Sequence, residues 1–339
     1  MSVLPASSRE WHLVARPHGW PTPADFALRE TPVSEPAEGR ILVKNLHFSV
    51  DPYMRGRMND VKSYIPPFAL GETMTGGAVG RVVESTAATH PVGSVVVHDL
   101  GWRDVAQGDA SAFRVVEEIP GVPISAYLGI LGLTGLTAYV GLVHIAHLKP
   151  GDSVFISGAA GAVGTAAGQI ARLEGASRVI GSAGSAEKVA LLTDRYGYDA
   201  AFDYKQAPVR EQLRGLAGDG IDVYFDNVGG DHLEAALDVM RNGGRAALCG
   251  AISAYNATER TPGPDNMVNI ISRGLTLEGF TLGNYTHVFP EFAAKMGPWL
   301  ASGDVVHDET VVDGIENSVD AFLQLMHGGN VGKMLVKVA

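Results

Sequence analysis

Three glycines at three-residue spacing could bind the phosphates of a nucleotide. Gly158, Gly161 and Gly164 follow the apolar run 152–157 (DSVFIS), and an Ala-rich stretch comes directly after them. The run reads as a buried strand and the stretch as a helix. In a strand–turn–helix unit, such glycines let a pyrophosphate approach the N–H groups at the helix start. Because Ala159 stands where GxGxxG has its first glycine, a turn that serves only helix–strand packing is the alternative.

The residues after the next predicted strand indicate which dinucleotide would bind. In an NAD site, an Asp or Glu at this strand end accepts a hydrogen bond from the adenosine ribose 2′-OH. Here the strand ends in Ala and Gly, and Lys188 follows shortly after. A cation there would pair with the 2′-phosphate of NADP, and Tyr204, at the end of the third predicted strand, could add a phenol hydrogen bond. The sequence therefore favours NADP, with Glu187 as the alternative ribose acceptor and an ordinary solvated lysine as the alternative for Lys188.

Hydride transfer from such a cofactor requires a group that stabilises the negative charge developing on the substrate. A phenol can donate a hydrogen bond to an oxyanion and relay a proton without a metal. Four of the ten tyrosines lie in segments that could meet a substrate, namely Tyr53, Tyr64, Tyr255 and Tyr285. Tyr255 follows the fifth predicted strand, at the edge where a dinucleotide binds. Spacing alone makes none of the four catalytic, since most tyrosines are core or surface residues.

The sequence contains little that could hold a metal. Its single cysteine, Cys249, excludes an intrachain disulfide and a multi-cysteine zinc site, and neither CxxC nor HExxH occurs. His144 and His147 could share a helix face, but they lie at a predicted helix end, where imidazoles often interact with the helix dipole. No GxSxG turn indicates a serine nucleophile. We therefore predict no metal, and for Arg55 and Arg57 we expect only hydrogen bonds that anchor loops.

Two patterns of secondary structure divide the chain. Over residues 1–126, short β-rich runs alternate with Gly, Pro and polar turns, which indicates a compact, partly closed β domain. Over 127–303, strands alternate with helices, which is typical of a doubly wound parallel sheet with its ligand crevice beyond the strand carboxyl ends. The last segment, 304–339, returns to β character (GNVGKMLVKV), and we expect it to rejoin the first domain.

Individual elements of the middle segment follow from hydrophobic periodicity and from Gly and Pro stops. We predict strands over 153–157, 178–182, 200–204, 221–226, 245–250 and 275–280. We predict helices over 132–148, 165–173, 186–196 and 232–240. The first of these helices should end before Pro150.

The composition excludes several other classes of protein. With 339 residues, 46% of them hydrophobic and 19% charged, the chain can form two globular domains. A net charge of −11 argues against a nucleic-acid surface, which needs clustered Lys and Arg. No run approaches 18 apolar residues, and the N-terminus lacks the apolar core of a signal peptide. We therefore expect no membrane attachment and a cytoplasmic location.

A set of motifs in a fixed order resembles a known family. The motifs are SVDPYMRGRM, GETMTGGAVGRVVES, GLTGLTAYVGL, SGAAGAVGTAAGQIA, GSAEK, FDNVGG, CGAISAYN and GGNVGKMLVKV. Together they resemble the zinc-independent medium-chain dehydrogenase/reductase family, in the group of leukotriene B4 12-hydroxydehydrogenase/prostaglandin reductase, alkenal double-bond reductase and curcumin reductase. The resemblance covers nearly the whole chain. FSVDP and LGETM stand where zinc-containing relatives carry a Cys and a His ligand, and the cysteine lobe of the structural zinc is also missing.

This resemblance implies a GroES-like β domain that holds substrate and a Rossmann domain that binds NADPH, in a homodimer that reduces the C=C bond of α,β-unsaturated ketones and aldehydes. The residues that match the family's cofactor contacts are Gly161, Ala162, Val163, Gly164, Lys188, Tyr204, Asn227, Cys249, Gly250, Ala251, Ile252, Ser253, Tyr255, Phe280, Thr281, Leu282 and Asn330. Tyr255 resembles a tyrosine near the nicotinamide ribose, and Tyr64 one that faces the substrate. The segments 53–67 and 256–269 vary among relatives, so they do not reveal which enone fits.

The reaction expected from these assignments is hydride transfer from NADPH C4 to the substrate β-carbon, which leaves an enolate. The ribose 2′-OH and a phenol would hold the enolate oxygen, with Tyr255 and Tyr64 leading and Tyr53 as a further catalytic candidate; Tyr53, Tyr64 and Tyr285 are the candidates for substrate contact. A phenol-linked water or bulk solvent would protonate the α-carbon. Quinone reduction by NADPH is the alternative reaction, and an NADPH-binding sensor or structural protein without important turnover is the alternative class. The missing zinc ligands weaken alcohol oxidation.

Overall fold

A computed structural model describes residues 5–338. The chain forms two compact units, which we name the β unit (Met1–Leu128 with Glu309–Ala339) and the α/β unit (Gly129–Asp308). The chain passes from one unit to the other after Leu128 and again after Asp308. None of the helices in the described residues is both long and apolar enough to cross a membrane.

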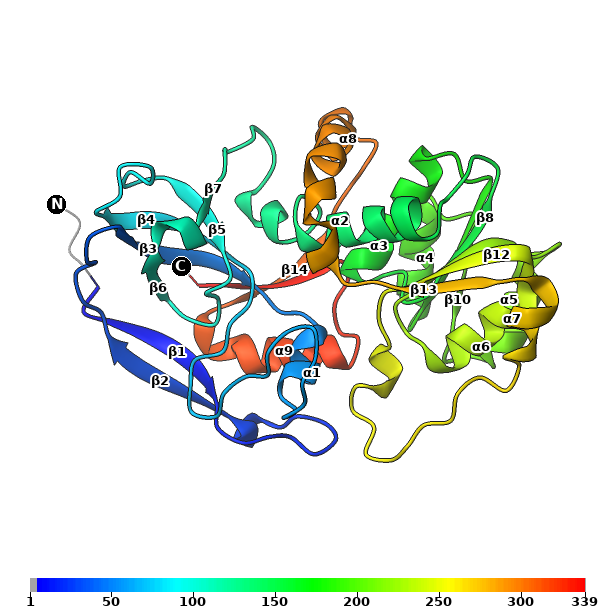
Figure 1. The fold of residues 1–339 in the computed structure, drawn as a ribbon, viewed down its shortest axis with the longest axis horizontal. Helices are drawn as coiled ribbons and strands as arrows, with labels where there is room; N and C mark the ends of the chain where they lie inside the picture. The colour runs from blue at the N-terminus through cyan, green and yellow to red at the C-terminus, as the bar shows by residue number, and fades with distance from the viewer. Residues whose placement is uncertain (1–4, 339) are drawn as a thin grey trace. The chain divides into compact units, whose positions relative to one another are not determined.

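The α/β unit is built on a six-stranded sheet in the order β10-β9-β8-β11-β12-β13 (Figure 1). Every neighbouring pair is parallel. The strands are β8 (Ser153–Ile156), β9 (Arg178–Ala183), β10 (Ala200–Asp203), β11 (Ile221–Asp226), β12 (Met240–Leu248) and β13 (Thr276–Gly279). The chain runs outward from β8 to β10 and restarts at β11 on the other side of β8, so the direction of winding reverses there. At such a point the loops diverge and leave a crevice at the carboxyl ends of the strands.

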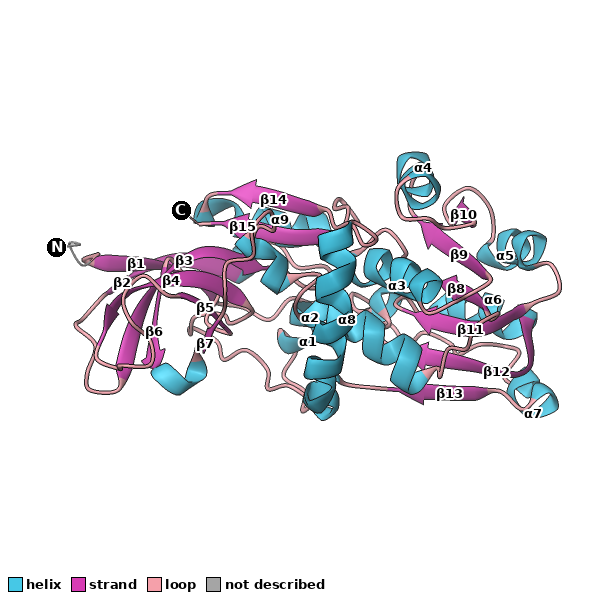
Figure 2. Ribbon diagram, turned by 90° about the horizontal axis from the view of Figure 1, so that it is seen from above, coloured by secondary structure: helices cyan, strands magenta, loops and turns pink. Residues whose placement is uncertain are grey.

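Helices cover both faces of this sheet, whose strands lie side by side in Figure 2. Right-handed crossovers place α3 and α4 on one face and, after the reversal, α5 and α6 on the other. The helices are α2 (Leu133–Tyr139), α3 (Ala162–Leu173), α4 (Ala186–Asp194), α5 (Val209–Ala217), α6 (Gly230–Val239), α7 (Val268–Arg273) and α8 (Phe289–Ser302), with short turns η4 (Val140–Ile145), η5 (Ile252–Ala254) and η6 (Leu282–Val288). Phe155, Phe202, Leu213, Tyr224 and Leu237 are buried in one core cluster between the strands and α5 and α6.

The predicted doubly wound parallel sheet is confirmed, and all six predicted strands are present. β12 begins at Met240, five residues before its predicted start, because two glycines at 243 and 244 hide the strand pattern. The helix predicted over 132–148 becomes a π-helical turn after Tyr139 and ends at Ile145. His147 lies beyond it with φ of +47°, so the two histidines do not share a helix face, and the preference for a helix-end position over a metal site stands.

The β unit combines the N-terminal segment with the C-terminal one. Its main sheet has the order β14-β15-β3-β4-β5-β7, with β6 paired to β3, and β1 and β2 form a separate pair. The strands are β1 (Ser7–Leu13), β2 (Phe26–Pro32), β3 (Arg40–Ser49), β4 (Ala78–Ser85), β5 (Val95–His98), β6 (Val105–Asp109), β7 (Arg114–Val115), β14 (Glu309–Asp313) and β15 (Lys333–Lys337). β15 pairs antiparallel with β3, with Leu335 opposite Ser49. The returning segment therefore completes the sheet that the N-terminal segment begins.

Two helices and four short turns connect these strands. They are α1 (Tyr53–Arg57), α9 (Ser318–Met326), η1 (Pro23–Asp25), η2 (Ala110–Ala112), η3 (Ile124–Leu128) and η7 (Ile315–Asn317). α9 packs on β15, and its Phe322 meets the buried Trp102 edge-to-face at 6.3 Å between ring centroids. Such an aromatic contact adds to the burial of both rings. It holds α9 against the N-terminal half of the unit.

Candidate functional site

The cofactor-contact candidates of the α/β unit all follow the carboxyl ends of its parallel strands. Gly161 to Gly164 follow β8, Lys188 follows β9, Tyr204 follows β10, Asn227 follows β11, Cys249 to Tyr255 follow β12, and Phe280 to Leu282 follow β13. Since parallel strands end at the same edge of a sheet, the fold gathers these distant positions along one edge. Asn330, Tyr53 and Tyr64 belong to the β unit.

The glycine turn after β8 has room for backbone only. Gly158 has φ of +60°, a conformation that residues with side chains rarely adopt. A Cβ atom on Gly164 would lie 2.5 Å from Cα of Ala159, so the start of α3 packs directly on the turn. α3 begins after Gly161, and no side chain caps its first N–H groups. The turn therefore fits a pyrophosphate, which such N–H groups bind well.

Positive charge gathers at the ends of β9 and β10. Lys188 is half-buried in the first turn of α4, where burial, together with the nearby Lys205 ammonium, lowers its pKa. Lys205 lies 5.7 Å from the centroid of the Tyr204 ring. A phosphate here would relieve the repulsion between the two lysines. The sequence prediction missed Lys205, although it stands next to Tyr204.

Glu187, the alternative ribose acceptor, is engaged elsewhere. Its exposed carboxylate accepts hydrogen bonds from its own backbone N–H and from Ser185, and these bonds lower its pKa. Ser185 in turn caps α4 by accepting from the N–H of Lys188, at 3.3 Å. Glu187 thus stabilises the start of α4, where a negative charge is favourable.

A buried carboxylate joins the ends of β8 and β11. Asp226, 2% exposed, accepts hydrogen bonds from the Tyr224 hydroxyl (2.7 Å) and from the N–H groups of residues 228 and 229 (2.9 and 2.7 Å). Burial raises its pKa. Ser157 donates to the same carboxylate at 3.2 Å and accepts from the N–H of Asn227 at 2.9 Å. Asp226 and Ser157 therefore position Asn227; the sequence prediction did not include them, although FDNVGG places the Asp at a strand end.

The run after β12, residues 249–255, folds back onto the end of β11. The N–H groups of Cys249 and Gly250 donate to the carbonyl oxygen of Asp226 at 2.9 and 3.0 Å. The Tyr255 hydroxyl lies 3.4 Å from where a Cβ atom on Gly250 would stand, close to the backbone of Asn227. Burial raises the pKa of the Tyr255 phenol, and that of the Cys249 thiol to about 12. Both groups therefore keep their protons at neutral pH, and the phenol remains a hydrogen-bond donor.

The residues after β13 form an aromatic group. The Phe280 ring packs edge-to-face against Phe225 (6.5 Å between centroids) and against Tyr285 (6.3 Å). Thr281 precedes η6, the short helix that contains Tyr285. The structure therefore places Tyr285 beside the predicted cofactor contact Phe280.

In the β unit, the structure brings Tyr53 and Tyr64 together around one cation. Arg57 hydrogen-bonds to Tyr53, and Tyr64, which is 69% exposed, lies close enough to influence the pKa of both side chains. Arg57 also donates to the carbonyl oxygen of Pro66 and to the Thr75 hydroxyl, both at 3.0 Å. It thus anchors the loop that carries Tyr64, as expected, and it also contacts a candidate phenol.

Comparisons with known proteins agree with this arrangement. Residues 9–116 match a family model described as the N-terminal domain of oxidoreductase, and residues 162–297 match one described as zinc-binding dehydrogenase. The NADPH-dependent curcumin reductase of Escherichia coli (strain K12) is 40% identical, over 98% of this chain and 97% of that protein. The NADP(+)-dependent 2-alkenal reductase of Nicotiana tabacum is 39% identical, over 95% of this chain and 94% of that protein.

A solved structure is similar along the whole chain. CurA from Vibrio vulnificus, in complex with NADPH, superposes with a TM-score of 0.93 at 42% identity, over 98% of this chain and 99% of that one. The chain belongs to the medium-chain dehydrogenase/reductase family. Within that family it falls in the group of curcumin, alkenal and prostaglandin reductases, as its motifs indicate. The GroES-like and Rossmann-type domains expected for this family are confirmed.

The second family model is described as a zinc-binding dehydrogenase, which raises the question of a metal site in this chain. Among residues 5–338, no three His, Cys, Asp or Glu side chains come together in a group that could hold a metal ion. His144 lies instead beside Glu291, with 3.4 Å between its Nε2 and the carboxylate. The pairing fits the expected position of this imidazole at a helix end.

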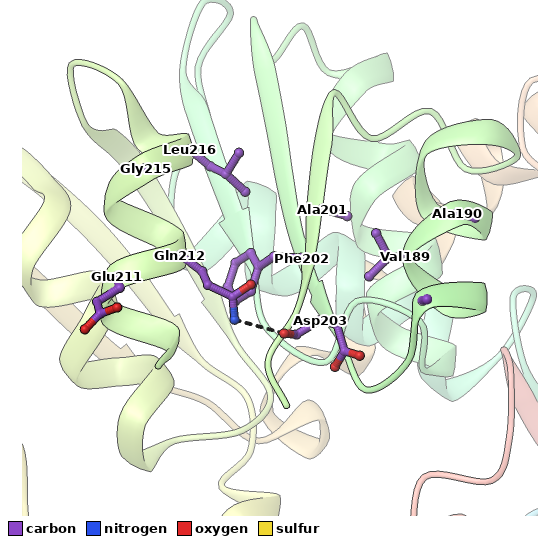
Figure 3. A pocket seen from close by; sticks show the side chains of 10 residues that line it. Val189, Ala190, Ala201, Phe202, Asp203, Glu211, Gln212, Gly215 and Leu216 are labelled. Atoms are coloured by element: carbon purple, nitrogen blue, oxygen red, sulfur yellow. Dashed lines mark hydrogen bonds between the residues drawn. The ribbon is translucent and has the colours of Figure 1, made fainter. Parts of the chain in front are cut away.

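A hollow of about 630 Å³ lies at the β10 edge of the Rossmann sheet, between α4 and α5 (Figure 3). Phe202 and Leu216 contribute apolar surface, and Gln212 donates to the carbonyl oxygen of Asp203 at 2.9 Å. None of the predicted site residues lines this hollow. It is therefore separate from the residues gathered at the carboxyl edge.

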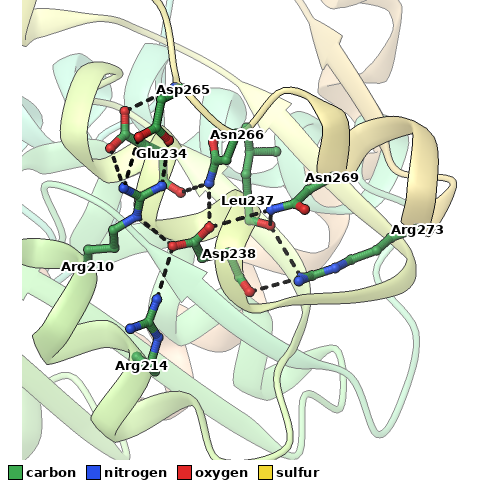
Figure 4. A network of polar contacts seen from close by, with 9 residues as sticks. All are labelled: Arg210, Arg214, Glu234, Leu237, Asp238, Asp265, Asn266, Asn269 and Arg273. Atoms are coloured by element: carbon green, nitrogen blue, oxygen red, sulfur yellow. Dashed lines mark hydrogen bonds and ion pairs between the residues drawn. The ribbon is translucent and has the colours of Figure 1, made fainter.

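Part of the segment 256–269, predicted to be a substrate loop, is held by a polar cluster (Figure 4). Arg210 pairs with Asp265 at 2.6 Å, with Glu234 at 3.0 Å and with Asp238 at 2.5 Å. Asn266 donates to the Asp238 carboxylate at 2.6 Å, and α7 begins at residue 268. The prediction of a loop is therefore confirmed for 256–267 and wrong for residues 268 and 269, which begin α7.

His232 lies behind Tyr204 in the core of the α/β unit. It is 4% exposed, and its ring meets Tyr204 edge-to-face at 5.5 Å and stacks on Phe155 at 6.5 Å between centroids. Its Nε2 is buried without a hydrogen-bond partner in the described structure. Burial lowers the pKa of this imidazole to about 4.

Replacing His232 by phenylalanine should stabilise the protein at pH 5. In the unfolded chain, the His232 imidazole has its ordinary pKa of about 6.5. In the folded protein its pKa is about 4, so the unfolded state binds the proton first and the free energy of unfolding falls as the pH drops from about 6.5 to about 4. Phenylalanine keeps the ring contacts and takes up no proton. We expect a gain of about 2 kcal/mol in the free energy of unfolding at pH 5 relative to the effect at pH 7.5. Urea unfolding at both values measures this gain; the exposed His18→Phe is the control, and an equal effect at both pH values would contradict the prediction.

Proposed function

We propose that this protein is an NADPH-dependent reductase of the C=C bond in α,β-unsaturated ketones and aldehydes. The observation that carries the proposal is the set of residues at the carboxyl edge of the Rossmann sheet. A glycine turn, a pair of lysines and a protonated phenol lie after the ends of β8, β9, β10 and β12. Two relatives at 39 and 40% identity over nearly the full chain are NADPH- or NADP(+)-dependent reductases by name.

The residues at this edge fit NADPH rather than NADH. Gly161 to Gly164 would bind the pyrophosphate through the N–H groups of α3. Lys188, with Lys205 and the Tyr204 phenol, would hold the 2′-phosphate, which NADH lacks. Asn227 and the run after β12 would hold the nicotinamide half of the cofactor. The NADP prediction agrees with the cofactor named for the relatives and for the similar crystal structure.

When bound, NADPH supplies a hydride from C4 of its nicotinamide to the substrate β-carbon. The chain must then stabilise the enolate oxygen, and phenols are its available donors. The leading candidates for this donor are Tyr255 in the α/β unit and Tyr64 in the β unit, and Tyr53, close to Tyr64, is a further candidate. A protonated phenol donates to the oxyanion as charge develops, and a linked water or bulk solvent delivers the proton to the α-carbon.

One assay tests this function directly. Purified protein and NADPH are mixed with one acceptor at a time: trans-2-alkenals, a conjugated enone or a quinone. The loss of NADPH absorbance is followed, and the same reactions with NADH are the control. We expect turnover of the alkenals and the enone, preference for NADPH, and a product heavier by two hydrogens. Oxidation of NADPH by the quinone alone would replace the proposal with quinone reduction. Cofactor binding without any turnover would indicate a sensor or structural protein.

We further propose that two copies associate through the β13 end of the Rossmann sheet. β13 is an edge strand, and the neighbouring α7 leaves Val268 and Ile271 65% and 84% exposed. An open strand edge beside exposed apolar side chains is a common feature of protein interfaces.

Replacing Ile271 by aspartate should therefore shift the protein from dimer to monomer, because a charge would be buried at the centre of the contact. Light scattering after size exclusion, at micromolar concentration, measures the mass. Val92→Asp, at a position that is 61% exposed in the β unit, is the matched control and should remain dimeric. A monomeric wild-type protein, or an Ile271→Asp variant with unchanged dimeric mass, would contradict this arrangement.

A further inference from the structure

We propose that the buried ion pair between Lys333 and Asp51 is a positioning pair, which fixes α1 so that Tyr53 presents its phenol to the substrate. The inference rests on the proposed function for the role of Tyr53. It concerns only residues of the β unit, and neither partner of the pair is among the predicted site residues.

The ion pair lies deep in the β unit. The side chains of Lys333 and Asp51 are 5% and 7% exposed, and 2.6 Å separate Nζ from the carboxylate. Lys333 also donates to the carbonyl oxygen of Val50 at 3.2 Å, and the Ser49 hydroxyl donates to the second oxygen of Asp51. No other ion pair among residues 5–338 is as deeply buried on both sides. Burying two charges is costly even when they pair, and in some proteins such a pair specifies geometry rather than adding stability.

The geometry it specifies is the start of α1. This helix has only five residues, too few to be stable by itself, and no side chain caps its first turn. Lys333 holds Val50 and Asp51, the residues that lead into the helix, and the Asp51 carbonyl oxygen accepts from the N–H of Met54 at 3.2 Å. Tyr53 is the first residue of the helix. Its direction therefore depends on a lysine from the opposite end of the chain.

The rest of α1 is tied down by other groups. Arg55 is buried and donates to the carbonyl oxygens of Pro17 (3.3 Å) and Gly19 (2.8 Å), and Arg57 holds the Tyr64 loop. These bonds fix the middle and the end of the helix, as expected for two loop-anchoring arginines. The start of the helix is held by the ion pair, and Asp51 is also close enough to raise the pKa of Tyr53, after the larger effect of burial.

Lys333 also connects α1 to a predicted cofactor contact. It begins β15, three residues after Asn330, whose side-chain amide donates to the carbonyl oxygen of Gly332 at 2.8 Å. Asn330 is 6% exposed. The same lysine therefore joins the turn that carries Asn330 to the helix that carries Tyr53.

Replacing Lys333 by methionine should lower kcat/KM for a simple enone about tenfold, since a displacement of roughly 1 Å at a reacting group can cost up to a hundredfold. Lys337→Met is the matched control, because Lys337 lies on the same strand and pairs with Asp313 at 3.7 Å while 48% exposed. The control should keep the wild-type kcat/KM. Wild-type kcat/KM in a folded Lys333→Met protein would overturn the inference.

A double-mutant cycle separates positioning from general damage. Lys333→Met should lower kcat/KM in the wild-type protein and have little effect in the Tyr53→Phe protein, where the phenol to be positioned is gone. A merely structural role would lower kcat/KM by the same factor in both backgrounds. That equal factor would overturn the inference.

Two variants keep the test valid if Lys333→Met folds poorly. The double variant Asp51→Asn/Lys333→Met buries no charge and should fold, yet kcat/KM should stay low because no ammonium holds the turn. Lys333→Arg keeps the charge and should recover most of the lost kcat/KM. Full kcat/KM in the uncharged double variant would overturn the inference, because the two charges would then only neutralise each other.

A readout that needs no turnover distinguishes this inference from the proposed function. In protein labelled at tyrosine for NMR, the Tyr53 ring signal, assigned with Tyr53→Phe, should move in Lys333→Met and stay in place in Lys337→Met. A moved signal in a protein that reduces no enone would refute the proposed function and retain the positioning pair. An unmoved signal would refute the pair even in an active reductase.

Discussion

Replacing Tyr255 by phenylalanine should lower kcat on a simple enone about a hundredfold, the usual cost of removing one donor to a developing oxyanion. The structure supports this expectation in two ways. Backbone hydrogen bonds hold the run after β12 against the loop after β11, so the phenol has a defined position. Burial raises its pKa, so it carries its proton at neutral pH. Because phenylalanine retains the ring, the loss should fall on kcat more than on protein stability.

The measurement is steady-state kinetics with saturating NADPH and a conjugated enone. Tyr64→Phe is made alongside, since the second leading phenol belongs to the β unit and its loop is held by Arg57. Tyr127→Phe is the matched control, because the Tyr127 hydroxyl lies at an exposed site, where it donates to the carbonyl oxygen of Glu117 at 2.8 Å. If both Tyr255→Phe and Tyr64→Phe turn over at the wild-type rate, neither phenol stabilises the enolate.

Replacing Lys188 by alanine should raise KM for NADPH about thirtyfold and leave KM for NADH nearly unchanged. A hydrogen bond to a charged group contributes about 2 kcal/mol, and only NADPH carries the 2′-phosphate that would receive it. Lys188 is half-buried, and burial and the nearby Lys205 ammonium both disfavour its charge, which a phosphate would stabilise. Lys205→Ala should change KM in the same direction by a smaller factor, because Lys205 is exposed and solvent screens it.

The cofactor preference is best measured as the ratio of kcat/KM for NADPH and NADH with one enone. Lys149→Ala removes an exposed lysine before β8 and should leave the ratio unchanged. If Lys188→Ala also leaves it unchanged, the lysine is an ordinary surface residue. Glu187→Gln would then be the next variant, although its carboxylate is bonded to the start of α4.

Much of the α/β unit could be predicted from the sequence because its signals are local. Most strands of the sheet contain a short apolar run, although β12 does not begin with one, and the glycine turn lies directly between one strand and one helix. Parallel strands with helical connections leave few topologies, so the order of elements was sufficient to predict the fold class. The cofactor candidates follow strand ends, and the sequence alone shows where strands end.

The tertiary structure alone decided which distant residues support those candidates. Asp226 and Ser157 join β11 to β8, Lys333 holds Asp51 from the far end of the chain, and Arg210 binds Asp265. No local pattern marks these pairs, since a buried Asp or Lys reads as an ordinary surface charge until its partner is known.

The same reason explains the elements that differ from prediction. Apolar periodicity extends over 132–148, but the helix ends at Ile145 after a π-helical turn. The segment 256–269 reads as a loop, and only its last two residues differ, because they begin α7 beside the end of α6. Periodicity and glycine spacing therefore determined the fold class and the cofactor edge of this protein, because both depend on neighbours along the chain. Only the folded chain decided how its buried charges pair and where its phenols are held, because those interactions join residues far apart in sequence.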